Sequence, residues 1–458
     1  MIETDLAWSG ISAQHKLITT GHLRPTELLD AQMARIEALD PRLNAFVTLT
    51  KERAYDDARR AEVGSSPASR TNPLRGIAIG LKDTIDTAGI RTTSGCAAFA
   101  DRVPVRDAEA ARLLREAGTI LVGKLATHEL AYGGTTNNEW LGPTRNPWDL
   151  TRIPGGSSGG SAVAVATAMC AGALGSDTCG SIRIPSALSG CVGIKPTRGL
   201  VSVEGVLPLA PELDNVGPIA RKVEDATLLL GCLLQRPISA KAAEMAGMRV
   251  GVLDRYFCEL LDEGVGRCFT QSIDDLARLG VLLEDVDASI PADAAEHVFV
   301  VCGAAAHDIH DPLLADHRDE IGPSVRERLE IPMPAAHELA SSKDVLERIS
   351  AGINSAFDGH DILIAPTVPM TAPPIGATEV PLGPATLDFE LAVTRCTSPF
   401  NVAGTPVVSV PCGLAQGLPV GLQIIARRNQ DEQAIAFAAA FERATPWHEA
   451  RPPLASGI

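Results

Sequence analysis

Aromatic residues are scarce in this chain of 458 residues, since Phe, Trp and Tyr together make up only 4% of it. Charged residues are also few, at 21%, and acidic ones outnumber basic ones, so that the formal net charge is −16. The chain therefore lacks the basic surface with which proteins neutralise a phosphate backbone, and we expect no direct nucleic-acid partner. The 45% share of apolar residues fits a globular chain with a substantial core and excludes wholesale disorder.

The sequence also lacks a disulfide framework and a targeting segment. Its ten cysteines include no Cys-x-x-Cys pair, which in so long a chain indicates reduced thiols and a cytoplasmic setting. The start, MIETDLAWSGISAQHKL, has no basic segment followed by an apolar one, so we expect no signal peptide. Residues 153–176 carry no charge, but glycines and serines leave the apolar part too short to span a bilayer. We therefore expect no membrane contact.

Residues 154–196 form the most informative stretch, with two serines in glycine-rich sequence on either side of an apolar segment. A serine hydroxyl becomes a useful nucleophile only beside a base and near donors for the oxyanion that forms. Histidine is the usual base, but none of the ten histidines lies in this stretch. Lys82 follows the uncharged run 77–81, which is typical of a buried strand, and burial keeps an amine neutral. Lys82, Ser157 and Ser181 are therefore candidates for base, proton shuttle and nucleophile.

The glycines around these serines indicate what kind of site they form. Glycines at 155, 156, 159 and 160 allow the main chain to approach a substrate closely. The sequence Asp-Thr-Cys-Gly-Ser at 177–181 is typical of a tight turn whose N–H groups converge on one oxygen. Residues 161–174 are all small or apolar, which predicts a helix packed inside a sheet structure.

The motifs GLKD, PGGSSGGS, GSDTCGSIRIPSALSG and GIKPTRG, in this order within residues 74–221, resemble those of the amidase signature family. Members of that family hydrolyse carboxamide C–N bonds with a Ser-Ser-Lys triad. The resemblance implies that Lys82 is the general base, Ser157 the bridging serine and Ser181 the acyl-enzyme nucleophile. It further implies a cis peptide between Gly156 and Ser157, and no cofactor or metal.

The resemblance also assigns supporting groups. The oxyanion hole would be made by the backbone N–H groups of four consecutive residues, Thr178, Cys179, Gly180 and Ser181. By analogy with the family, the acyl pocket would be lined by Tyr132, Gly133 and Gly134. This chain departs from the family pattern at one place, because Cys179 stands where the usual motif has a glycine. We interpret the departure as a subtype difference, since all three triad residues are present.

Each of these features also has an ordinary structural interpretation. A Gly/Ser-rich run is often a linker or a phosphate-binding loop, but such a loop continues as Gly-Lys-Ser/Thr and this one has no lysine there. An isolated lysine is usually solvated, and isolated serines usually cap helices or turns. His128 is expected to be a buried packing residue. The spacing of His307 and His310, with His317 beyond, allows a metal site, but a solvated polar helix face explains it better.

Hydrophobic periodicity divides the chain into zones. Residues 1–64 are predicted to form a helical arm, with helices at 9–20, 26–39 and 51–62, followed by a loop at 65–73. Residues 65–458 are predicted to form one α/β domain, a large mixed sheet covered by helices on both faces. Its motif core spans 74–221 and a variable, substrate-specific zone about 238–357. Strands are expected at 77–81, 120–122, 249–253, 281–286 and 361–365, a hairpin at 405–411 and 419–426, and helices at 107–117, 274–279 and 431–443.

We therefore expect an amidase that hydrolyses a small or medium carboxamide, with ureas, carbamates and esters as further substrates to test. One alternative is the glutamine-hydrolysing A subunit of a tRNA-dependent amidotransferase, which passes ammonia to a partner; Cys179 departs from the double glycine usual in that subunit. Another is a non-catalytic binding protein on the same fold, against which the three retained triad residues argue. A homodimer is the oligomer expected on statistical grounds.

Overall fold

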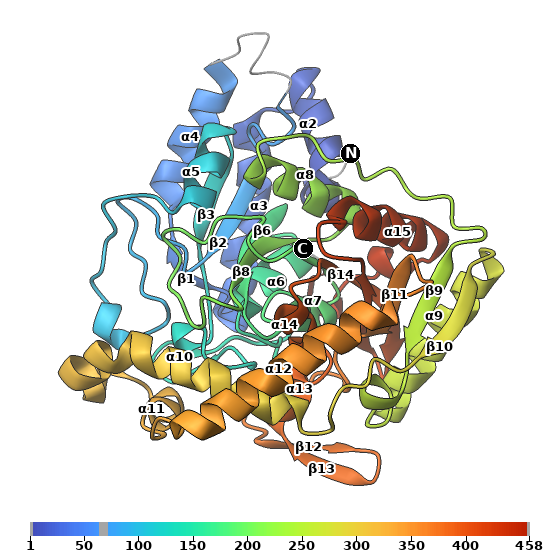
Figure 1. Ribbon diagram of the computed structural model, residues 1–458. Helices are drawn as coiled ribbons and strands as arrows, with labels where there is room; N and C mark the ends of the chain where they lie inside the picture. Colours follow the sequence, from blue (N-terminus) through green and yellow to red (C-terminus); the bar gives the residue numbers. More distant parts are fainter. Residues whose placement is uncertain (1–2, 64–71, 456–458) are drawn as a thin grey trace.

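The computed structural model describes residues 3–63 and 72–455 of the chain. In this described part, a mixed sheet of 11 strands runs through the molecule in the order β1-β3-β2-β6-β8-β7-β14-β15-β11-β9-β10 (Figure 1). Strand β2 pairs in parallel with β3 and β6, whereas β8, β7, β14 and β15 pair with antiparallel neighbours. The strands are β1 Phe46–Leu49, β2 Ala78–Lys82, β3 Ile120–Leu125, β6 Gly172–Asp177, β7 Val192–Lys195, β8 Asn215–Ala220, β9 Arg249–Leu253, β10 Leu282–Val286, β11 Ile362–Pro366, β14 Val407–Ala415 and β15 Leu418–Ile425.

Helices cover both faces of this sheet, as the sequence predicted. Successive strand residues point to opposite faces, and Ala78 and Ile79 accordingly belong to different apolar clusters. One face packs on α3 and α6 and the other on α5, α8 and α15. The helices of these layers are α1 Glu3–Trp8, α2 Ile11–Thr19, α3 Pro25–Leu43, α4 Lys51–Val63, α5 Glu109–Glu116, α6 Gly159–Ala166, α7 Arg183–Ser189, α8 Val223–Leu233, α9 Glu263–Arg278 and α15 Asp431–Ala444.

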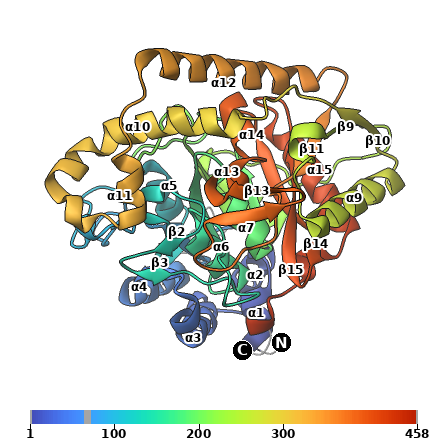
Figure 2. The same ribbon diagram turned by 90° about the horizontal axis from the view of Figure 1, so that it is seen from below.

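A further layer of helices lies beyond one end of the sheet and comes mostly from the zone predicted to be variable. Figure 2 shows α10 and α12 running along this side of the molecule. The layer has its own apolar cluster, in which Phe257 and Phe400 stack with ring centroids 5.4 Å apart. Its elements are α10 Ala294–His317, α11 Pro323–Leu329, α12 Ala336–Ala356, α13 Phe389–Thr394 and α14 Ser398–Ala403, with the hairpin β12 Glu379–Leu382 and β13 Ala385–Asp388 beside α13.

Helix α10 with its continuation to Glu320 is long and apolar enough to cross a membrane by length and composition. It packs against α11, α12 and α14 of this helical layer. A third of its most apolar window is buried inside the molecule.

The structure corrects several predictions of local structure. The arm is not wholly helical, because Phe46–Leu49 forms β1 and pairs with β3 in the main sheet. The helix expected over 161–174 ends at Ala166, and Gly172 already begins β6, since a short buried strand and a buried helix share one apolar pattern. The strands β14 and β15 extend to a two-residue turn. His310 is buried rather than solvated. Part of the loop expected at 65–73 lies outside the described residues.

Candidate active site

Lys82 lies at the end of β2 and is completely buried. Its amine is directed at two serine hydroxyls, one of them on the neighbouring strand β6 (Figure 1). Its Nζ lies 2.6 Å from Ser157 Oγ and 2.8 Å from Ser176 Oγ. Parallel pairing of β2 with β6 brings Ser176, near the end of β6, beside Lys82. The sheet therefore positions Lys82 and Ser176, and the segment before α6 adds Ser157 to the same buried group.

Burial lowers the pKa of Lys82 to about 7, although the negative charges of Asp177 and Asp214 oppose the shift. Desolvation disfavours the charged form of an amine, and each hydroxyl that accepts from it also holds it in place. At neutral pH a substantial share of Lys82 is therefore a neutral base.

Ser181 lies partly exposed in the turn between β6 and α7. The backbone N–H of Ser158 donates to the Ser181 carbonyl at 3.2 Å, which joins this turn to the Ser157 segment at the start of α6. The peptide between Gly156 and Ser157 is cis. Within the described residues, no hydrogen bond joins Ser157 Oγ to Ser181 Oγ; such contacts often tighten only when substrate binds. The three predicted triad residues are thus gathered at one place.

The turn that carries Ser181 also presents backbone donors. Among the described residues, the N–H groups of Thr178, Cys179, Gly180 and Ser181 donate to no protein acceptor. Gly180 has φ +135°, and a Cβ there would lie 2.3 Å from Thr397 Oγ1, so only glycine fits. The turn can offer these donors to an oxygen beside Ser181.

A buried ion pair holds this turn against α7. Asp177 and Arg183 are fully buried, and Arg183 Nη2 lies 3.0 Å from Asp177 Oδ1. Burial would raise the pKa of Asp177, but the Arg183 charge and the hydrogen bonds from Arg183 and Asn401 lower it to about 2. The other carboxylate oxygen accepts from Ile182 N at 3.1 Å. The pair therefore fixes the chain on both sides of Ser181.

The three residues that the family resemblance assigned to an acyl pocket lie together beside Ser181. Tyr132, Gly133 and Gly134 line one small pocket together with Cys179 and Ser181. The loop before them is strained, since Leu130 and Ala131 have φ of 52° and 60°. Neighbouring elements hold it: Arg328 donates to the Tyr132 carbonyl at 2.7 Å, and Gly134 N donates to Glu390 at 2.9 Å.

The Cys179 side chain faces Cys302 of α10, which lines the same pocket. The hydrogen bond with Cys302 and burial raise the pKa of Cys179. The thiol is therefore protonated at neutral pH, the form in which cysteine is a poor nucleophile. Thr397 Oγ1 donates to the Cys179 carbonyl at 2.5 Å. Because the C=O and N–H of one trans peptide point to opposite sides, this contact directs the Gly180 N–H away from Thr397.

The histidines take no part in this group. His128 is buried, and burial lowers its pKa to about 3, so it is neutral; its backbone N–H donates to the Ser157 carbonyl. In the described residues, no cluster of three or more His, Cys, Asp or Glu is arranged to hold a metal ion.

Sequence reasoning missed three residues of the site. Ser176 was a polar residue at the end of a strand of small residues, a signal that could have been used. Arg328 and Glu390 come from the variable zone and from α13, far from any motif, and nothing in their local sequence marks them. Only the tertiary structure brings them to the pocket.

The model of the family described as Amidase matches residues 27–435. The chain belongs to this amidase family. It is 36% identical to the A subunit of glutamyl-tRNA(Gln) amidotransferase from Roseiflexus sp. (strain RS-1), over 97% of this chain and 98% of that protein. The protein of the same name from Moorella thermoacetica is 35% identical, over 96% and 97%.

Solved structures of this amidase family share the fold. A crystal structure described only as an amidase has TM-score 0.88 and 33% identity, covering 95% of this chain and 99% of its own. The A subunit of the glutamyl-tRNA(Gln) amidotransferase from Thermotoga maritima has TM-score 0.81 and 33% identity, with 96% of each chain covered. A bacterial aryl acylamidase has TM-score 0.88 at 26% identity, with 98% and 99% covered. The predicted α/β fold and the amidase family are confirmed. Between the two enzymatic interpretations of the sequence, the curated relatives favour the amidotransferase component over the free-standing hydrolase that we expected first.

Proposed function

We propose that this protein hydrolyses the C–N bond of a carboxamide through an acyl-enzyme on Ser181. The observation that carries the proposal is the buried Lys82 amine, 2.6 Å from Ser157 Oγ, with a pKa of about 7. A buried neutral lysine beside a hydroxyl is the base that a serine nucleophile needs in the absence of histidine.

In the proposed cycle, Lys82 takes a proton from Ser157, and Ser157 takes one from Ser181 as its Oγ attacks the carbonyl carbon. The N–H groups of residues 178–181 hold the resulting oxyanion. Ser157 then protonates the leaving nitrogen and takes a proton back from Lys82, which becomes neutral again; the C–N bond breaks, and ammonia or an amine departs. Water repeats the relay on the ester and releases the carboxylic acid, so that the net reaction consumes one amide and one water.

Glutamine is a second, more specific candidate for the amide, and the names of the curated relatives favour it. In that case this chain would supply ammonia to partner proteins that bind tRNA. The acidic chain would meet the nucleic acid only through those partners. The pocket is lined by one cation, Arg328, and one anion, Glu390. The α-carboxylate of glutamine could approach Arg328, and its α-ammonium group could approach Glu390.

The test of the nucleophile is to trap the acyl-enzyme. An activated ester or anilide should leave its acyl group on the tryptic peptide that contains Ser181, detected by mass spectrometry, and Ser181→Ala should carry none. An acyl group found reproducibly on Ser157 would reverse the two assignments. No adduct and equal amide hydrolysis by wild type and Ser181→Ala would refute the proposal.

A further inference from the structure

The pocket at Ser181 is too small to hold more than the reacting group of a substrate. Its volume is about 30 Å³. For comparison, a cavity needs ~10–15 Å³ to hold a single water molecule. A second cavity of about 330 Å³ lies beside it. The two share Tyr132, Phe299, Arg328 and Glu390 in their walls, so the larger cavity adjoins the smaller one across these side chains. The outer cavity is therefore the adjoining space that the rest of a substrate could occupy.

The charged groups at the neck between the two cavities are already paired. Arg328 Nη2 lies 2.9 Å from Glu390 Oε1, and Arg328 Nη1 donates to the Tyr132 carbonyl. Glu390 Oε2 also accepts from Gly134 N. An α-carboxylate and an α-ammonium group placed here would have to compete with these contacts, because each charge already has a partner. The neck is therefore built to hold its own loop in place.

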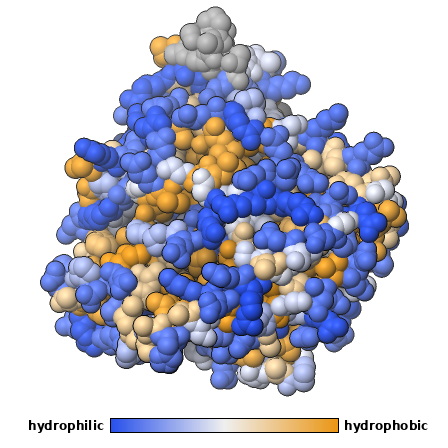
Figure 3. Space-filling view, viewed as in Figure 1, coloured by the Kyte–Doolittle hydropathy of each residue, from blue (hydrophilic) through white to orange (hydrophobic). Residues whose placement is uncertain are grey.

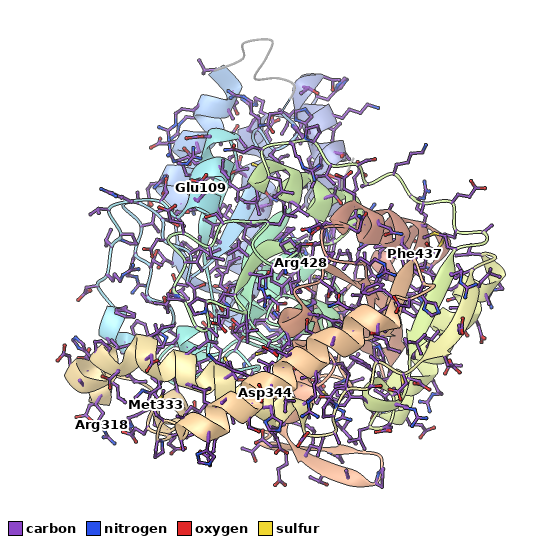
Figure 4. All side chains as sticks on the ribbon, viewed as in Figure 1. Glu109, Arg318, Met333, Asp344, Arg428 and Phe437 are labelled. Atoms are coloured by element: carbon purple, nitrogen blue, oxygen red, sulfur yellow. The ribbon has the colours of Figure 1, made fainter. Side chains whose placement is uncertain are left out.

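Beyond the neck, the wall is mostly apolar and comes from α10 and from the segment between α11 and α12. Ile331 and Met333 of that segment are 62% and 40% exposed at the rim. Figure 4 labels Met333 in this segment, and Figure 3 shows apolar residues among polar ones over the same side of the molecule. The remaining apolar lining is Tyr132, Phe299, Val300, Ala304, Pro332, Pro334 and Leu391, and besides the neck pair the polar lining is His307 and Asp388.

We infer that the outer cavity binds an apolar arm, alkyl or aryl, on the acyl side of the amide whose carbonyl reacts at Ser181. This inference rests on the proposed function and narrows its substrate class. It separates the two candidate substrates of the preceding subsection, a simple carboxamide and glutamine. The charged α-ammonium and α-carboxylate groups of glutamine would gain nothing from the apolar wall beyond the neck. Each methylene of the arm that enters the cavity should raise kcat/KM about fourfold, the equivalent of ~0.8 kcal/mol.

The experiment measures kcat/KM for linear primary amides from propanamide to octanamide, with glutamine beside them. Gly303 faces the outer cavity from α10, and a Cβ there would lie 3.3 Å from Tyr132 Oη. Gly303→Phe should fill the cavity and reduce the ratio of octanamide to propanamide at least tenfold. Ala315→Phe adds the same ring at an exposed position of the same helix and should leave the ratio unchanged. Met333→Asp, at the exposed rim, is the second variant should Gly303→Phe fail to fold.

The outcomes separate this inference from the proposed function. A ratio that rises with chain length and falls in Gly303→Phe or Met333→Asp supports the apolar arm. Glutamine hydrolysis without any preference for longer amides overturns the inference and leaves the Ser181 reaction standing. If no amide is hydrolysed, calorimetry with Ser181→Ala decides: binding that tightens with chain length supports the cavity as the site of the arm, and equal affinities overturn it.

Discussion

At the scale of single residues, burial sets the chemistry of Lys82. Among the residues that the structure describes, three lysines are completely buried, and burial lowers the pKa of each: to about 7 for Lys82 and Lys195 and about 8 for Lys124. Lys195 donates to two backbone carbonyls and Lys124 to a carbonyl and a threonine hydroxyl, so neither faces a serine. A lowered pKa is thus common to all three, and only Lys82 combines it with two serine hydroxyls.

The protonation of Lys82 predicts the pH dependence of activity. The neutral amine is the base, and its share grows as pH rises through about 7, so kcat/KM should rise through that pH and then level off. Lys82→Ala should cost at least about a hundredfold. Lys82→Arg keeps its charge at every pH and should show no rise. Lys195→Met, the matched control, should retain the wild-type profile. Near-normal turnover of an unactivated amide by Lys82→Ala would contradict the role of this lysine.

Cys179 should be dispensable as a side chain although its backbone faces the substrate. Cys179→Ala should keep kcat to within about tenfold, a difference of ~1.4 kcal/mol, because Ser181 supplies the nucleophile. A maleimide adduct on wild-type Cys179 should block the pocket, whereas Cys179→Ala treated in the same way should stay active. A loss above about a thousandfold in folded Cys179→Ala would show that the nucleophile is the cysteine.

At the scale of elements, the turn between β6 and α7 depends on one glycine. Gly180→Ala would bring a Cβ to 2.3 Å from Thr397 Oγ1 at φ +135°, so the turn must move. We expect kcat to fall about a hundredfold, the effect of losing one oxyanion donor. Gly247→Ala is the matched control, because it has φ +80° and nothing within 4 Å. Equal kcat for Gly180→Ala and wild type would exclude a role for this turn geometry.

The ion pair between Asp177 and Arg183 should matter more to stability than any surface pair. Arg183→Met leaves a buried carboxylate without its partner and should lower the free energy of unfolding by ~3–5 kcal/mol. Arg249→Met breaks an exposed pair with Glu284 and should cost less than ~1 kcal/mol. Urea unfolding measures both. The Asp177 contribution is present above the unfolded pKa and is lost as pH falls toward about 2, so the difference between the variants should shrink in acid.

At the scale of the whole molecule, the question is whether this chain acts alone. The Ser181 group, its donors and the outer cavity all come from one chain. We therefore expect the protein purified from its native host to hydrolyse octanamide without added partner proteins, and to show no retention on tRNA at physiological salt. Copurification of further proteins, with amide hydrolysis that appears only in their presence, would instead support the amidotransferase interpretation.

The sequence by itself determined the family, the fold class and which residues are candidates for the active site. Lys82, Ser157 and Ser181 lie in motifs whose glycines indicate turns and whose apolar neighbours indicate buried strands. These features could be recognised because the conformation of a turn or a short strand depends mainly on adjacent residues. Strand β9 could be predicted to the residue, and β2, β3, β10, β11, β14 and β15 to within four residues, since their apolar runs are bounded by polar segments. Strands β7 and β8 of the same sheet were not predicted. The boundary between α6 and β6 escaped, because small apolar residues suit a buried helix and a buried strand equally.

Only the tertiary structure decided what surrounds that chemistry. β1 could not be told from a helical arm until its pairing with β3 was seen, because pairing is a contact between distant segments. Ser176 became a partner of Lys82 through the register of β2 on β6. Arg328 and Glu390, 62 residues apart in the sequence, form a hydrogen-bonded ion pair in the pocket wall. No local sequence pattern predicts this contact. Substrate choice depends on such long-range contacts and on the cavity they enclose, and these are properties of packing that no short stretch of sequence carries.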